Sequence, residues 1–160
     1  MRNVDVTVRS YQLGDAPALI ELFERSVRDV GPARYSPAQV SAWLRGARDP
    51  QHWHERLAER EAYIAQTPDG TVLGWIEMEL DGHLDYLYCA PEATRSGVAD
   101  VLYAVLIAGA RKLGITRLTT EASRFAESFF SRHGWQLDRR EVITRDGVEI
   151  DRARMSVALG

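Results

Sequence analysis

Hydrophobic and polar positions follow different periods along the first third of the chain. Val4, Val6 and Val8 are separated by polar residues, and this period of two predicts a strand. Apolar residues then recur every three or four positions, which predicts a helix that begins after a capping Asp15 and ends at Gly31. A pair of shorter helices is predicted to follow. The N-terminal third is therefore expected to contain one strand and several helices.

From residue 62 the period returns to two. The alternation predicts three strands between residues 63 and 90, separated by turns at 68–70 and 81–82. Both turns contain Asp-Gly, which supplies the positive φ angle that tight hairpin turns require. Because the strands follow one another directly, they are expected to form an antiparallel meander.

The remaining chain alternates between the two periods. It predicts a long helix over residues 98–113, a strand over 115–121, a short helix that ends at Gly134, and two strands that meet at Asp146-Gly147. The whole order predicts an α/β (α+β) fold with a mixed, mainly antiparallel central sheet of about seven strands and helices on both faces. No repeat or linker interrupts it, so residues 1–160 are predicted to form one domain.

Composition and charge exclude several classes of function. The 160 residues are 45% hydrophobic, enough for one compact core, and 20 Lys and Arg against 23 Asp and Glu give a net charge of −3. No basic stripe is present, which argues against nucleic-acid binding, and no segment approaches the ~18 apolar residues that cross a bilayer. Cys89 is the only cysteine, which excludes an intramolecular disulfide and fits a reducing compartment. We expect a cytoplasmic protein that binds neither nucleic acid nor membrane.

The loop over residues 89–99 is the strongest candidate for chemistry, because it joins a predicted strand directly to the long helix. The first backbone N–H groups of a helix have no intrahelical partner, and the helix dipole makes that end positive. Gly97 and Ala99 leave the helix start free of bulk, and Arg95 adds a positive charge. This arrangement predicts a diphosphate site. The competing interpretation is that Gly97 only permits a tight entry into the helix.

This loop, the helix and strand after it, and the short helix that ends at Gly134-Trp135 resemble the GNAT superfamily of acetyl-coenzyme A-dependent N-acyltransferases. The resemblance covers nearly the whole chain in the order of its elements. The family motif is glutamine or arginine, two residues, glycine, one residue, then glycine or alanine. Gly97 and Ala99 match its last two fixed positions, whereas Thr94 stands where glutamine or arginine is usual.

The resemblance implies acetyl-CoA as the cofactor, with its pantetheine arm along the end of the strand and its diphosphate on the helix start. The runs over residues 81–88 and 119–123 resemble a bacterial subgroup whose members mostly lack assigned substrates, so the acceptor is left open between small-molecule and peptide amines. The cofactor-binding residues so predicted are Leu87, Tyr88, Cys89, Thr94, Arg95, Ser96, Gly97, Val98, Ala99 and Ser123.

Amide formation from a thioester and an amine requires a base that removes a proton from the ammonium form. Asp85 is the first candidate, since it matches the position of the catalytic glutamate in the histone-modifying members of the family. A period of two also predicts that it shares one strand face with Leu87 and Cys89. Glu77 and Glu79 on the neighbouring strand are alternatives that act through water, and a salt bridge is the competing role for Asp85.

Two further roles are an oxyanion donor and an acid for the departing thiolate. A backbone N–H near Tyr88 or Cys89 can serve as the donor. Many family members use as acid a tyrosine four residues before the glycine that ends the short helix, and that position holds Phe130 here. Tyr88, Tyr86, Ser123 or water could substitute, although strand tyrosines more often pack and Ser123 is a natural helix cap.

Other chemistry-bearing residues are assigned structural roles. Cys89 has no obvious His or Asp partner and is interpreted as a buried hydrophobe rather than a covalent nucleophile. His52 and His54 diverge on a helix, so no metal site is expected. The acceptor pocket is expected between the early helices and the final hairpin, and the residues proposed to line it are Arg34, Tyr35, Trp43 and Trp53.

These observations predict an N-acetyltransferase that works by direct transfer to a primary amine in a ternary complex. The alternative is an acyl-CoA-binding sensor or structural module with little turnover, since Thr94 and Phe130 both depart from the family pattern. The net negative charge of the chain favours a positively charged acceptor. The free edge of the terminal hairpin makes a homodimer possible.

Overall fold

A computed structural model describes residues 5–45 and 49–160, and within them the chain forms a seven-stranded sheet in the order β1-β2-β3-β4-β5-β7-β6. The strands are β1 (Thr7–Ser10), β2 (Glu61–Gln66), β3 (Val72–Met78), β4 (His83–Cys89), β5 (Arg117–Ala122), β6 (Gln136–Arg145) and β7 (Val148–Ala158). The helices are α1 (Ala16–Val30), α2 (Pro37–Leu44), α3 (Pro50–Ala58), α4 (Val98–Lys112) and α5 (Glu127–Arg132), with 3₁₀ turns η1 (Gly31–Ala33) and η2 (Pro91–Ala93). The predicted mixed sheet is confirmed, while the predicted strand residue Val4 lies outside the described residues.

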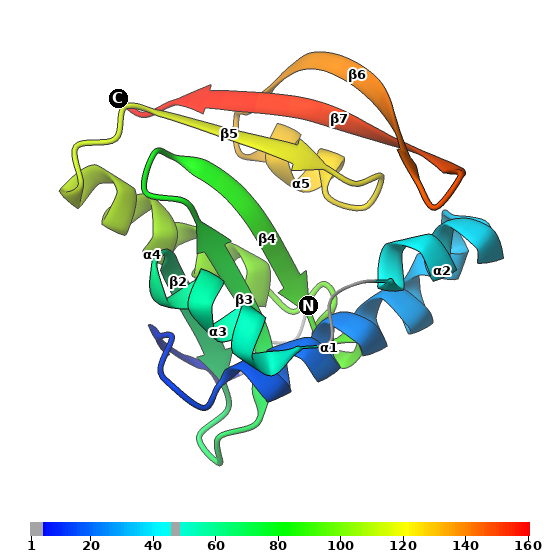
Figure 1. Cartoon of the computed structure of the whole chain (residues 1–160). Coiled ribbons are helices and arrows are strands. Elements are labelled where there is room, and N and C mark those ends of the chain that lie inside the picture. Colours follow the sequence, from blue (N-terminus) through cyan, green and yellow to red (C-terminus); the bar gives the residue numbers. More distant parts are fainter. Residues whose placement is uncertain (1–4, 46–48) are drawn as a thin grey trace.

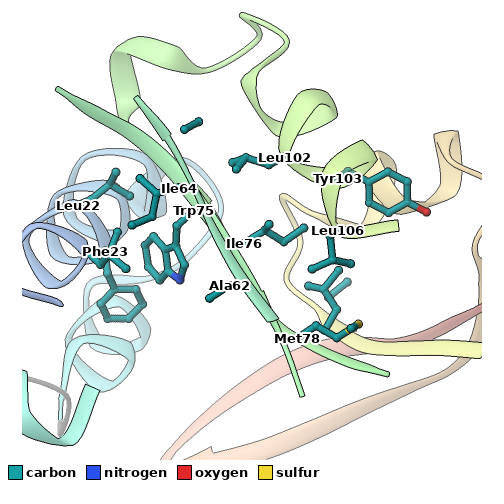
Figure 2. Close-up of a cluster of buried hydrophobic side chains, with 14 of the residues drawn as sticks. Leu22, Phe23, Ala62, Ile64, Trp75, Ile76, Met78, Leu102, Tyr103 and Leu106 are labelled. Atoms are coloured by element: carbon teal, nitrogen blue, oxygen red, sulfur yellow. The ribbon is translucent and has the colours of Figure 1, made fainter. Parts of the chain in front are cut away.

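The sheet is covered by helices on both faces, as the apolar patterns require. Helices α1 and α3 pack on one face of the meander β2–β4, and α4 packs on the other (Figure 1). Figure 2 shows Phe23 of α1 and Trp75 of β3 on the first face of the sheet. Ile76 of β3 and Leu106 of α4 lie on the second face. None of the helices in the described part of the chain is both long enough and apolar enough to cross a membrane.

The sheet has one short parallel pairing, and this pairing positions the site. Strands β4 and β5 are paired only at His83–Thr119 and Leu84–Thr120, whereas every other neighbouring pair is antiparallel. After Leu84 the two strands diverge, as Figure 1 shows. The rest of β4 is therefore bonded to β3 on one side and has no strand on the other.

Most predicted helix starts are correct, although Asp15 does not cap its helix and α5 begins at Glu127, beyond the predicted cap Ser123. Asp15 stands at the N-cap position of α1, but its carboxylate accepts hydrogen bonds from Arg9 and from the Gln12 N–H instead of capping the helix. Arg9 is the better partner because it joins the carboxylate with two charge-assisted bonds. Ser36 caps α2 as predicted, in a reciprocal capping box with Gln39.

Candidate functional site

A cleft of about 660 Å³ lies where β4 and β5 diverge. Its walls come from α1, η1 and α2 on one side, from β5, α5 and the β6–β7 hairpin on the other, and from β4 and the start of α4 (Figure 1). Of the predicted site residues, those that line the cleft are Asp85, Leu87, Tyr88, Cys89, Thr94, Arg95, Gly97, Ala99 and Ser123. Two others have their side chains elsewhere: the Ser96 hydroxyl donates to the Ala93 carbonyl, and Val98 is buried in the core.

The loop before α4 has the geometry of an anion site. Gly97 is the N-cap residue at φ 90°, and Arg95 also has a positive φ of 62°. A Cβ atom at Gly97 would meet nothing within 4 Å, so the space in front of the helix start is open. The N–H of Ala99 is in the first turn and has no intrahelical acceptor, while the N–H of Val98 donates a long hydrogen bond of 3.4 Å to the Ser96 hydroxyl. Gly97 thus both permits the turn and leaves room for a ligand at the positive end of α4.

Asp100 in the first turn of α4 was not predicted as part of the site. It lines the cleft and lies 2.9 Å from Arg132 and 2.8 Å from His133. Burial alone would raise the pKa of Asp100, but the hydrogen bonds from Arg132 and His133 bring it below its usual value. The Asp100 carboxylate is ionised, and its negative charge is offset by these partners. It therefore does not cancel the positive charge that the helix dipole places at the start of α4. The sequence feature that could have identified Asp100 is an acidic residue at the third position of the long helix, directly after the loop motif.

The ladder between β3 and β4 contains a bulge at Asp85. Glu77 pairs with Tyr86, and the next residue of β3, Met78, pairs with Leu84. Asp85 is therefore an extra residue without a partner on β3. A bulge of this kind interrupts the strict alternation of side chains between the two faces of a sheet.

The bulge decides which face of the sheet Asp85 occupies. The prediction that Asp85 shares a face with Leu87 and Cys89 is wrong. Its carboxylate lies 2.6 Å from Nη1 of Arg60, and the same nitrogen lies 3.0 Å from Oε2 of Glu77, on the face covered by α1 and α3. Asp85 thus enters the cleft from the side of the sheet opposite α4.

The three predicted bases are joined through one arginine but differ in access to the cleft. Glu77 is fully buried and accepts hydrogen bonds from Arg56, Arg60 and the indole of Trp75. Glu79 is 3.4 Å from Arg60 and does not line the cleft. The side chain of Asp85 is 34% exposed and does line it. Asp85 is therefore the one of the three that can reach a bound amine.

A second carboxylate, Glu121, faces the cleft from β5 and was missed by sequence reasoning. Its Oε2 lies 2.6 Å from Nε2 of His83, and Nδ1 of His83 lies 2.7 Å from Oγ1 of Thr119. Thr119 and Glu121 share one face of β5 because they are two residues apart. That alternation was visible in the sequence, but its link to His83 depends on the parallel pairing of β4 with β5.

Tyr88 is packed in an aromatic cluster beside the cleft. Its ring stacks on Trp75 at 5.3 Å between centroids and meets the edge of Phe23 at 5.1 Å. Burial raises the pKa of Tyr88 far above its usual value, so its hydroxyl keeps its proton at neutral pH. In this state Tyr88 can donate a hydrogen bond, but its raised pKa makes it a weaker proton donor than an ordinary tyrosine.

The other acid candidates lie around α5. Ser123 lines the cleft, and its hydroxyl accepts a hydrogen bond from the Ala126 N–H at 3.3 Å in the turn before α5. The predicted capping role is wrong, because Ala126 is the N-cap residue of α5 and no side chain caps the helix. Phe130 is buried against Trp135, with ring centroids 4.8 Å apart. An apolar ring therefore fills the position at which the family pattern has tyrosine.

Cys89 does not have the environment of a nucleophile. Burial raises the pKa of its thiol to about 12, and the negative charge of Asp100 contributes in the same direction. The thiol is therefore protonated near neutral pH and reacts slowly. Within residues 5–45 and 49–160, no three His, Cys, Asp or Glu side chains are grouped as a metal site would require.

The far end of the cleft lies between η1, α2 and the β6–β7 hairpin. Arg34, Tyr35 and Trp43 line it as predicted. Trp53 does not, because its side chain is fully buried and packs against Trp75 at 5.8 Å between centroids. The tip of the hairpin contributes lining residues that sequence reasoning did not single out, among them Arg145.

Comparisons with known proteins agree with this geometry. Residues 32–157 match the family model described as an acetyltransferase (GNAT) domain. A curated relative from Escherichia coli strain K12, named uncharacterized N-acetyltransferase YafP, is 35% identical over 132 residues, which are 82% of this chain and 82% of the relative.

Solved structures show the same fold. A GCN5-related N-acetyltransferase from Rhodopseudomonas palustris, described as an aminotransferase of class II, superposes with a TM-score of 0.91 at 27% identity, covering 99% of each chain. The PaiA N-acetyltransferase from Thermoplasma acidophilum, solved in complex with coenzyme A, superposes with a TM-score of 0.79 at 19% identity, covering 98% of this chain and 100% of that one.

Proposed function

The chain belongs to the GNAT acetyltransferase family, and from this premise we propose that it moves an acetyl group from acetyl-CoA to a primary amine by direct attack in a ternary complex. The observation that carries the proposal is the cleft between the diverging strands β4 and β5, which connects the start of α4 to a second opening beside the β6–β7 hairpin. One cleft with two ends suits two substrates that meet in the middle.

The residues at the α4 end fit coenzyme A. The open space at Gly97, the first-turn N–H groups and Arg95 suit a diphosphate, which carries negative charge and accepts hydrogen bonds. The unpaired edge of β4 from Asp85 to Cys89 offers backbone groups to an amide-containing arm. The PaiA N-acetyltransferase binds coenzyme A on the same fold.

When bound, acetyl-CoA supplies an activated acetyl group as a thioester. The chain's own residues then have three tasks. A backbone N–H near Tyr88 or Cys89 donates a hydrogen bond to the thioester oxygen, a fixed donor that needs no reorganisation. Asp85 accepts a proton from the incoming ammonium group, directly or through a water molecule. Tyr88 or Ser123 donates a hydrogen bond to the departing sulfur, and water supplies the proton, because burial raises the pKa of Tyr88 and makes its hydroxyl a weak acid.

Direct attack is favoured over an acetyl-enzyme. A covalent route would need a reactive nucleophile in the cleft, and the Cys89 thiol is held protonated by a pKa of about 12. Asp85 and Glu121, in contrast, present two carboxylates to the same space from opposite strands. Their placement suits proton removal from an amine already bound beside the cofactor.

One observation favours a second function, an acyl-CoA sensor with little turnover. The position of the usual tyrosine acid holds the buried Phe130, and Thr94 departs from the loop motif. A domain with an intact cofactor loop and a weak proton route would bind acetyl-CoA and transfer slowly. The two functions share the α4 end of the cleft and differ only in chemistry at the β4 strand.

The deciding experiment measures free-thiol release from acetyl-CoA with a panel of primary amines, beside a thermal shift with coenzyme A. The enzyme hypothesis expects stabilisation by coenzyme A and thiol release that depends on at least one amine. Stabilisation without release for every amine supports the sensor. Absence of both contradicts the cofactor assignment itself.

We also propose that residues 1–160 act as one catalytic domain and that β6 pairs with its copy in a homodimer. The supports are a single sheet with one apolar core and the free outer edge of β6, on which Leu137 is 44% and Val142 60% exposed. Light scattering after size-exclusion chromatography tests the dimer, and a monomeric mass at micromolar concentration contradicts it.

A further inference from the structure

The charges at the hairpin end of the cleft are not balanced. Three carboxylates line this end, and each has an arginine partner: Asp85 has Arg60 at 2.6 Å and Glu121 has Arg154 at 3.5 Å. Asp151, the third, is joined to Arg124 by two hydrogen bonds. In the described part of the chain, no carboxylate at this end is therefore left for a second positive group beside the reacting amine.

Four arginines line the same end, and two of them lack an acidic partner. Arg45 lies 3.4 Å from Asp146, and Arg152 lies 2.5 Å from Glu141. These two are therefore neutralised. The lining arginines without a carboxylate, as far as residues 5–45 and 49–160 are concerned, are Arg34 and Arg145.

Of these two, Arg145 lies on the hairpin wall and shares a strand face with Ile143, two residues before it, which also lines the cleft. It lies at the end of β6, next to the turn of the hairpin. Burial raises the pKa of Tyr86 and of Tyr88, and the positive charge of Arg145 opposes that rise at both hydroxyls. Its guanidinium is thus within electrostatic reach of β4. Arg34 sits on the opposite wall, with its guanidinium 5.6 Å from the ring centre of Phe125.

The surface between these arginines is apolar and aromatic. Tyr35 and Trp43 meet edge to face at 5.0 Å, and Tyr35 lies 5.9 Å from Phe125. Ile143 and Ile150 of the hairpin complete this part of the lining. A ligand here needs an apolar body as well as a charge.

We infer that the acceptor is a small amino acid, an amine that also carries one carboxylate and an apolar side chain, and that Arg145 binds the carboxylate. The inference deepens the proposed function and rests on it. The unpaired guanidinium of Arg145 matches one negative charge, and its planar fork suits the two oxygens of a carboxylate. The amine is then directed along the cleft toward Asp85. A net charge of −3 favoured a cationic acceptor, but the local balance in the cleft favours the opposite sign.

The first test compares two acetylated products that differ only in the carboxylate, N-acetyl-L-phenylalanine and N-acetylphenethylamine. Their affinities for the protein saturated with coenzyme A are measured by isothermal titration calorimetry. We expect the carboxylate to tighten binding at least about tenfold, the effect of one charge-assisted pair. Equal affinities, or no binding of either compound at millimolar concentration, overturn the inference.

The second test uses two arginine variants of the same hairpin. Arg145→Gln is expected to remove the preference for the carboxylate, and Arg145→Lys to restore part of it. Arg139→Gln is the matched control, since Arg139 is an exposed arginine of β6 outside the cleft and should keep the full preference. A preference that survives in Arg145→Gln overturns the assignment.

Thiol release separates this inference from the proposed function. L-phenylalanine and phenethylamine are compared as acceptors for the wild-type protein. Faster release with phenethylamine overturns the inference and leaves the acetyltransferase intact. Absence of release with any amine overturns the proposed function, and product binding alone then decides whether the cleft selects a carboxylate.

Discussion

At the scale of single residues, Asp85 is the proposed base. We expect Asp85→Asn to lower kcat/KM by about 10²-fold or more, because the amide keeps the shape but cannot take a proton, and to remove part of the rise of rate with pH. Rates across pH for the wild type and the variant measure both effects. Glu79→Gln is the matched control, because Glu79 contacts the same Arg60 outside the cleft.

Two outcomes would reassign the base. A wild-type rate in Asp85→Asn would give the role to Glu121, which lines the cleft from β5, or to water. An equal loss in Glu79→Gln would show that the Arg60 network, rather than a base, sets the rate. Circular dichroism of both variants confirms that the loss is not one of folding.

Cys89 gives a second prediction at this scale. Cys89→Ala is expected to keep turnover within about threefold of the wild type, because the thiol is protonated at a pKa of about 12 and serves as a small buried group. Thiol release and intact-protein mass after incubation with acetyl-CoA measure it. An acetylated wild-type protein together with an inactive variant would instead establish a covalent route.

Single residues also show where sequence reasoning stops. It selected Asp85 as the candidate that reaches the cleft, but it placed the side chain on the wrong face. The bulge that turns Asp85 is a property of its pairing with β3, and nothing in the residues of β4 alone marks it. Glu121 was missed for a similar reason, since its partner His83 is 38 residues away and adjacent only in the sheet.

At the scale of elements, the link between β4 and α4 is the proposed binding site of the cofactor. Gly97→Glu is expected to weaken coenzyme A binding by at least about 100-fold, because a carboxylate would occupy the open space that suits the diphosphate. Calorimetric titration with coenzyme A measures it. An unchanged affinity would contradict the loop assignment.

Gly70→Glu is a closely matched control. Gly70 has the same φ of +90°, and a Cβ added there would likewise meet no atom within 4 Å, but it lies in the turn between β2 and β3. Both variants carry the same backbone strain and the same added charge. Both should lose stability to a similar extent, and only Gly97→Glu should lose coenzyme A.

Elements were predicted well where the signal is local. Periods of two and of three to four, with the Asp-Gly turns, are enough to find the strands and most helix starts. The divergence of β4 from β5 has no such signal, because it depends on two strands separated by the whole of α4 that pair at only two positions. The resemblance to a known family placed the pantetheine arm along the end of β4, but no local pattern predicted the divergence.

At the scale of the whole molecule, the β6–β7 hairpin forms one wall of the cleft and is held by charge. Glu141 of β6 accepts hydrogen bonds from Arg154 at 2.7 Å and Arg152 at 2.5 Å of β7. The bond from Arg154, followed by that from Arg152, outweighs burial and lowers the pKa of Glu141 from 4.5 to about 2. The Glu141 carboxylate, which stays ionised in moderate acid, therefore stabilises the hairpin that carries Arg145.

This carboxylate predicts how stability depends on pH. Its pKa is lower in the folded chain than in the unfolded one, so its contribution is complete above pH 4.5 and is lost as the pH falls from 4.5 toward about 2. Glu141→Gln is expected to lower Tm by about 2–4 °C at neutral pH, corresponding to about 1 kcal/mol for a partly exposed pair, and to differ from the wild type progressively less as the pH approaches 2. Thermal unfolding between pH 2 and pH 7 measures both.

Glu149→Gln is the control, because the side chain of Glu149 makes no ion pair in the described part of β7, and its Tm difference should not vary with pH. A Glu141→Gln difference that stays constant across this range would show that the charge of Glu141 does not fasten the hairpin.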